Sequence, residues 1–178
     1  MKWWMVVAAM VTVVRVADAG ETGHSLTIDL QLRNDAQVPA HVLDKSQDEV
    51  ARIFAGAGFA VRWTETAPQL TVHIVPQVLG YSTAASPVMG VALRRPDGSM
   101  ARVFFRQVQD FARAYRVDLS TMLAYVIAHE VGHLLLPGYP HSSTGVMQAD
   151  WDKALVRDAT GGSLTFTAAQ SARIRATR

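Results

Sequence analysis

Apolar and polar residues alternate along several short segments of the chain, with the period of two that is typical of half-buried β-strands. The clearest case is SLTIDLQLR at residues 25–33, which Asn34-Asp35 ends with a turn. The same pattern predicts further strands at 59–64, 70–75 and 101–107, and a short edge strand at 88–94. We expect a loop at 77–87 and a turn at 95–98, where Pro and Gly interrupt the pattern.

Apolar residues at three- and four-residue spacing predict helices between these strands. The segments are 38–55, 108–115, a long helix that begins at Asp118 or Ser120 and runs to about Leu134, and a closing helix that Thr167 caps and that extends to about Arg175. Pro137 ends the long helix because it lacks an N–H group, and Gly138 lets the chain reverse. This order of elements predicts an α+β domain.

The first nineteen residues have the pattern of a secretory signal. Lys2 is followed by an apolar run at 3–14, and Ala17-Asp18-Ala19 offers a cleavage site before Gly20. The run is shorter than the roughly 20 apolar residues of a membrane span. We therefore expect a signal peptide at 1–19, a single domain at 20–178, and a secreted or periplasmic protein without stable membrane association after cleavage. The alternative is an uncleaved anchor, since Arg15 lies within the region before the cleavage site.

The composition and charge limit which kinds of partner and metal ligand can be expected. The chain has 178 residues, 49% of them hydrophobic, and a formal net charge of +2, as expected for one globular domain. Its arginines are scattered without a basic stripe interleaved with aromatics, so nucleic-acid binding is not expected. No cysteine is present, which leaves no thiolate to bind a metal. We expect a monomer.

The long helix carries the string His129-Glu130-Val131-Gly132-His133, an HExxH motif. Histidines four residues apart lie on one helix face, and a carboxylate beside two converging imidazoles is what a catalytic zinc site requires. The alternative is a pair of core histidines with Glu130 as a solvated neighbour. Burying these groups without partners would cost several kcal/mol, so the sequence favours the metal site.

His141 is the expected third ligand, because a catalytic zinc takes three protein groups. An extended segment from Pro137 to His141 spans about 16 Å, enough to fold back past the helix end. Asp150 and Asp152 are poorer alternatives because they are hard oxygen donors farther along the chain. An ordinary loop histidine is the other interpretation of His141. No pattern in the sequence places the remaining histidines at the site, namely His24, His41 and His73.

Around this motif the sequence resembles the metzincin zinc proteases, whose pattern is HExxHxxGxxH followed by a turn with a methionine. The resemblance covers residues 128–147, including Gly138, His141 and Met147. The sequence of this segment is also similar to that of small secreted bacterial enzymes of matrixin type. The Gly-x-x-His part begins two residues late, which indicates either a two-residue insertion, as we infer, or a third ligand elsewhere. The resemblance implies a twisted mixed sheet, an active-site helix, a Met-turn and a C-terminal helix.

The same resemblance implies a secreted zinc endopeptidase, with 20–178 as its catalytic domain and a peptide or protein as its substrate. Zn²⁺ would be held by His129, His133 and His141, and Glu130 would act as general base toward a zinc-bound water. Met147 would pack beneath the metal, and the edge strand at 88–94 would line the substrate cleft. Tyr139 is expected to be a loop aromatic, the alternative being a hydrogen-bond donor to the oxyanion. Two other functions stay open: a zinc hydrolase of a non-peptide amide or ester, and a non-catalytic zinc-binding domain.

Overall fold

The structure, a computed structural model, describes residues 26–77, 88–96 and 98–177 of the chain. The predicted signal peptide at 1–19, His24 and all but the first residue of the loop predicted at 77–87 lie outside the described residues.

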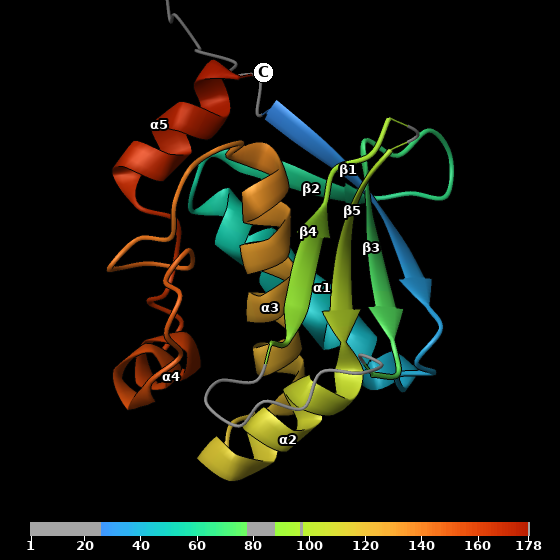
Figure 1. Ribbon diagram of the computed structural model, residues 1–178, viewed down its shortest axis with the longest axis vertical. Helices are drawn as coiled ribbons and strands as arrows, with labels where there is room; N and C mark the ends of the chain where they lie inside the picture. The colour runs from blue at the N-terminus through green and yellow to red at the C-terminus, as the bar shows by residue number, and fades with distance from the viewer. Residues whose placement is uncertain (1–25, 78–87, 97, 178) are drawn as a thin grey trace, which may run out of the picture.

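Five strands form one sheet in the order β2-β1-β3-β5-β4 (Figure 1). Strand β1 pairs in parallel with both β2 and β3, and β3 pairs in parallel with β5. Strand β4 runs antiparallel to β5 at the edge of the sheet. The strands are β1 (Leu26–Asn34), β2 (Phe59–Trp63), β3 (Leu70–Val75), β4 (Gly90–Leu93) and β5 (Ser99–Phe104).

Five helices accompany this sheet in the described residues. They are α1 (Ala40–Ala55), α2 (Phe105–Tyr115), α3 (Leu119–Leu135), α4 (Lys153–Thr160) and α5 (Ala168–Ala176). Helix α3 packs against α1, β5 and β4. In Figure 1 it stands between the sheet and the C-terminal segments that carry α4 and α5. The fold is therefore an α+β domain with a mostly parallel sheet, as the order of elements predicts.

The alternation of apolar residues explains which face of the sheet the helices cover. Alternate side chains of the three central strands are fully buried in one hydrophobic core with α1 and α3; they are Ile28, Leu30, Val72, Ile74, Ala101 and Val103. In β1, the residues between these buried positions are polar. Asp29 pairs with Arg62 of β2 across the opposite face, at 2.7 Å. A sheet with one apolar and one polar face can bury only the first, so the helices gather on that side.

The boundary between β5 and α2 lies three residues earlier than the sequence predicts. The strand predicted at 101–107 ends at Phe104, and α2 begins at Phe105, not at residue 108. The reason is that Phe105, Val108 and Phe111 are buried at helical spacing, so the apolar residues that lengthened the predicted strand belong to the helix. Helix α4 was not predicted. It has only eight residues, and Asp152 caps it by accepting hydrogen bonds from the N–H groups of Ala154 and Leu155.

None of the helices within the described ranges combines the length and apolarity that a bilayer crossing requires.

Candidate metal centre

Helix α3 begins where a side chain caps it. The carboxylate of Asp118 accepts hydrogen bonds from the N–H of Thr121, at 3.0 Å, and from the hydroxyl of Ser120. These bonds hold the pKa of Asp118 below its ordinary value, the hydroxyl of Ser120 having the larger effect. Of the two caps that the sequence allowed, Asp118 is the one used. The helix then passes through the core and ends at Leu135, two residues before Pro137.

The HExxH motif occupies the last turns of α3, where the first histidine is buried and the second is half-buried. The ring of His129 donates from Nδ1 to the carbonyl of Val146, at 2.8 Å, because a carbonyl oxygen can only accept. That bond leaves Nε2 of His129 with a free lone pair. Burial lowers the pKa of His129 to about 4, so the ring is neutral near pH 7. Burial also lowers the pKa of His133, with a further contribution from the charge of His141.

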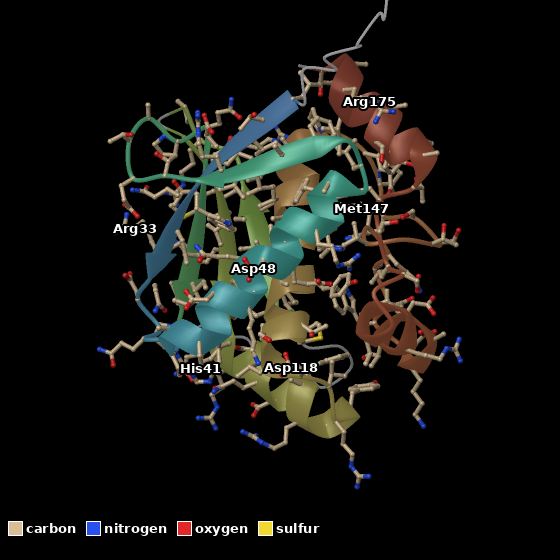
Figure 2. All side chains as sticks on the ribbon, turned by 180° about the vertical axis from the view of Figure 1, so that it is seen from behind. Arg33, His41, Asp48, Asp118, Met147 and Arg175 are labelled. Atoms are coloured by element: carbon tan, nitrogen blue, oxygen red, sulfur yellow. The ribbon has the colours of Figure 1, made fainter. Side chains whose placement is uncertain are left out.

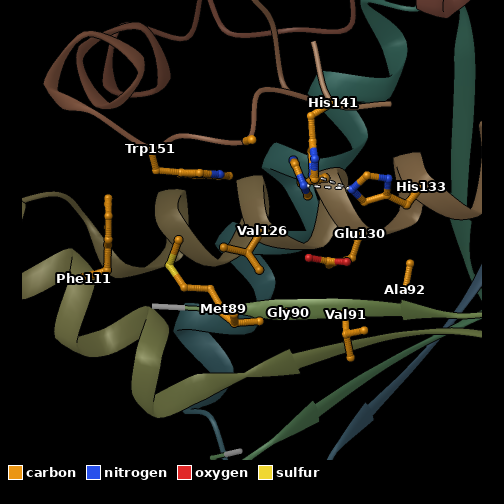
Figure 3. A pocket seen from close by; sticks show the side chains of 13 residues that line it. Met89, Gly90, Val91, Ala92, Phe111, Val126, Glu130, His133, His141 and Trp151 are labelled. Carbon is orange, nitrogen blue, oxygen red and sulfur yellow. Dashed lines mark hydrogen bonds between the residues drawn. The ribbon is translucent and has the colours of Figure 1, made fainter. Parts of the chain in front are cut away.

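The loop after α3 brings His141 to the two helical rings (Figure 3). Gly138 has a φ of +68°, a left-handed conformation that glycine adopts without strain, and there the chain reverses as the sequence predicts. Nε2 of His141 then lies 3.1 Å from Nε2 of His133. His141, and not Tyr139, reaches the other two rings.

The spacing of the three rings fits a shared metal ion. Nε2 of His133 lies 3.1 Å from Nε2 of both His129 and His141, and the ligand atoms all lie within 4.8 Å of one another. Two nitrogens that bind one tetrahedral zinc at about 2.05 Å are about 3.3 Å apart. Hydrogen bonding cannot account for both contacts, because Nε2 of His133 carries at most one proton. A cation between three lone pairs satisfies all of them, and the bond from Nδ1 of His129 to a backbone carbonyl is the orienting contact that metal-bound histidines usually make.

Glu130 lies between α3 and the edge strand β4 (Figure 3). It is 7% exposed, and burial raises its pKa to about 8. A dication at the neighbouring rings would favour the charged carboxylate and oppose the effect of burial. Gly90 of β4 makes room for this side chain: a Cβ atom at that position would lie 2.6 Å from Cγ of Glu130 and 2.8 Å from Oε1. A side chain at position 90 would require the carboxylate to move.

Met147 packs beneath the motif. It is fully buried, and a Cβ atom on Gly132, inside the motif, would lie 2.4 Å from its sulfur. The loop that carries Met147 is closed by a hydrogen bond from the N–H of Ser142 to the carbonyl of Met147, at 3.0 Å. Met147 therefore packs against the motif at Gly132, and the glycine at this position allows the contact; a position beneath a metal ion stays a prediction.

A pocket of about 400 Å³ opens beside the three rings and Glu130. The rest of its wall is apolar and comes from α2, α3, β4 with the two residues before it, and the loop before α4. The lining residues beyond the motif are Val88, Met89, Gly90, Val91, Ala92, Phe111, Val126, Ala149 and Trp151. Phe111 and Trp151 meet edge to face with ring centroids 6.2 Å apart, and Trp151 also faces the ring of His129 at 6.1 Å.

The other residues that the sequence analysis considered for the site lie outside the group of three rings. The ring of Tyr139 lies 5.5 Å from the guanidinium of Arg173 and does not line the pocket, in keeping with a loop aromatic. Asp150 and Asp152 are not in the group that could hold a metal. His73 pairs with Asp35 at 2.7 Å on the polar side of the sheet, and His41 is exposed on α1.

The segment at 88–94, which the resemblance placed at the cleft, does line the pocket through residues 88–92. Phe111 was missed from the sequence, because no local pattern relates it to the motif. Gly132 did carry a signal, because an isolated glycine in a buried helix costs about 1 kcal/mol relative to alanine and commonly marks a close approach by a neighbour.

The α+β domain thus brings three imidazoles and a carboxylate to one pocket, two of the rings from a buried helix and the third from the loop after it. The sequence matches no protein-family model and no curated protein. Among solved structures it is similar to a zinc-dependent peptidase from Methanocorpusculum labreanum, with a TM-score of 0.54 and 16% identity over 83% of this chain and 99% of that chain. At this identity the likeness establishes a shared fold.

Proposed function

We propose that this protein is a secreted zinc-dependent endopeptidase of metzincin type. The observation that carries the proposal is the convergence of the Nε2 atoms of His129, His133 and His141, with Glu130 beside them in a pocket bounded by an edge strand. The structural likeness to a zinc-dependent peptidase supports the same function. The turn before His141 is two residues longer than in the metzincin pattern, and the proposal takes His141 as the third ligand despite this difference.

In this proposal the three imidazoles hold Zn²⁺ as neutral ligands. The ion would polarise a substrate carbonyl and lower the pKa of a coordinated water toward 7. Glu130 accepts the proton of the attacking water and then delivers it to the leaving amine. The carbonyl of Val146 keeps His129 in the tautomer that presents Nε2 to the site.

An extended peptide is the substrate that the cleft suits best. Among the described strands, β4 pairs with β5 alone, so its outer edge has backbone groups available for another strand. A peptide that adds to this edge would run past Glu130 and place a carbonyl near the three rings. The apolar wall formed by Val126, Phe111 and Trp151 would then receive a side chain of the peptide.

Metal analysis and cleavage of an unfolded protein test the function together. We expect one zinc per chain and hydrolysis that a chelator stops and added zinc restores. Glu130→Gln should keep the zinc and lose about 10²–10⁴-fold in kcat. His141→Ala should bind zinc more weakly. Turnover that survives in Glu130→Gln refutes the role of the general base, and unchanged zinc affinity in His141→Ala refutes the third ligand. Cleavage of ester or non-peptide amide substrates in place of peptides would assign a different hydrolase.

We further propose that residues 1–19 are a cleaved export signal. The support is the sequence pattern of Lys2, the apolar run and the Ala-x-Ala site before Gly20. N-terminal sequencing of the exported protein should give Gly20 as the first residue. An exported form that still begins at Met1 would indicate an anchor.

A further inference from the structure

Gln170, in the first turn of α5, is 0% exposed and uses both ends of its side-chain amide. Its Oε1 accepts a hydrogen bond from the N–H of Thr167 at 2.8 Å, and the hydroxyl of Thr167 accepts one from the N–H of Gln170, a reciprocal capping box. A glutamate serves in such a box as well as a glutamine does. The amide nitrogen is therefore available for another purpose.

That nitrogen donates to the hydroxyl of Ser142 at 2.9 Å, and Ser142 is the residue after His141. Ser142 makes two further hydrogen bonds. Its hydroxyl donates to the carbonyl of Thr144 at 2.7 Å, and its N–H donates to the carbonyl of Met147 at 3.0 Å. The link from Gln170 thus joins the C-terminal helix to the backbone immediately beside the third ring.

The ring of His141 needs such support more than the ring of His129 does. His129 is buried, and the carbonyl of Val146 fixes its orientation. His141 is exposed, and the hydrogen-bond contact that its ring makes within the described part of the chain is the one to His133. Its placement therefore depends on its own backbone, which the bonds of Ser142 hold.

We propose that Gln170 is a positioning residue for metal binding: through Ser142, it holds Nε2 of His141 at ligand distance from His129 and His133. The proposal rests on the zinc site of the proposed function. Contacts behind the ligands of a metal site change metal affinity about 10- to 100-fold when they are lost, because a ligand that is free to swing must be ordered on binding.

Three variants of the full protein separate this role from the folding of α5. Ser142→Ala removes the link and leaves the capping box intact. Gln170→Leu removes both. Thr167→Val is the matched control, because it deletes the capping hydroxyl, keeps the shape of the side chain and leaves the link between Gln170 and Ser142 in place. The readouts are the zinc dissociation constant, from competition with a chelator, and the melting temperature of the metal-free protein.

We expect Ser142→Ala and Gln170→Leu each to weaken zinc binding by about 10- to 100-fold. The double variant should be no weaker than the weaker single, because the two residues act through one bond. Thr167→Val should lower the melting temperature and leave the zinc dissociation constant within about twofold of the wild type.

Wild-type zinc affinity in both Ser142→Ala and Gln170→Leu would overturn the proposal and leave the metal site standing. An equal loss of affinity in Thr167→Val would also overturn it, since the effect would then come from a loosened α5. A wild-type protein that binds no zinc would instead refute the metal site itself, a different result that competition with the chelator identifies directly.

Discussion

Replacing Gly90 with alanine should displace Glu130, the proposed general base, without changing its chemistry. The added Cβ atom would lie 2.6 Å from Cγ of Glu130, 2.8 Å from Oε1 and 2.9 Å from Cδ. Carbon atoms in contact are normally about 3.5–4.0 Å apart, so one partner must move by about 1 Å. Strand β4 is paired with β5 along all four of its residues, whereas Glu130 can rotate about its side-chain bonds. We therefore expect the carboxylate to move.

The activity should fall far more than the stability. A displacement of about 1 Å at a reacting group costs about 10²-fold in rate, which corresponds to about 2.7 kcal/mol of lost transition-state stabilisation. Overpacking costs about 1–3 kcal/mol of folding free energy. Part of that is offset, because alanine is favoured over glycine within a strand by about 0.5–1 kcal/mol. Gly90→Ala should therefore be folded, bind zinc and have about 1% of the wild-type kcat/KM.

The assay is kcat/KM on an unfolded protein or an internally quenched peptide, with zinc content and urea unfolding measured on the same preparation. Gly56→Ala is the matched control, because a Cβ atom there meets its nearest neighbour at 3.4 Å, an ordinary contact, and Gly56 lies outside the pocket. If Gly90→Ala retains wild-type kcat/KM with one zinc per chain, the carboxylate does not need the position that the structure gives it.

Three other substitutions test the support of α3, each by urea unfolding of the metal-free protein. Gly132→Ala should lower the free energy of unfolding by about 1–2 kcal/mol, because the overlap with the sulfur of Met147 outweighs a helix-propensity gain of about 1 kcal/mol. The double variant with Met147→Ala should lose less stability than the two single variants combined. Simple additivity of the two losses would contradict the contact. Arg94→Ala removes hydrogen bonds from the guanidinium to two carbonyls in the last turn of α3 and should cost about 1 kcal/mol, which an unchanged unfolding curve would disprove. Asp118→Ala should cost about 1 kcal/mol near pH 7. Because the folded state lowers the pKa of Asp118, that stabilisation is present above the unfolded pKa of about 3.9 and is lost as pH falls through the folded value. The difference in unfolding free energy between the variant and the wild type should therefore shrink below about pH 4. A difference that does not depend on pH would argue against the charged cap.

The elements with strong local periodicity could be predicted from the sequence. Strand β1 and helices α1 and α3 lie within two residues of their predicted ends, because alternation or helical spacing persists over nine residues or more. The boundary between β5 and α2 was misplaced because Phe104 and Phe105 are both buried, and two adjacent apolar residues fit either period. The short helix α4 depends on its cap and on contacts with α3, neither of which has a distinctive pattern.

At the site, sequence spacing indicated the three histidines and Glu130, and the structure brings the three rings together; their role as zinc ligands stays a prediction. The three histidines could be predicted because two of them share a helix face, and the third lies eight residues after the second, beyond a proline and a left-handed glycine. The surroundings of these residues could not be predicted in the same way. Gly90 lies 40 residues before Glu130, and Gln170 lies 28 residues after Ser142, distances over which no local period relates two positions.

Helix α3 is the one element that both sides of the site share. On the sheet side, β4 brings Gly90 against Glu130 and forms the wall of the cleft. On the other side, the segment after α3 brings His141, and its carbonyl at Val146 orients His129. The HExxH string alone therefore presents two rings and a carboxylate without a cleft or a third ligand. A metal ion bound here would join the C-terminal segment to α3, so its binding free energy would also stabilise the packing of that segment on the helix.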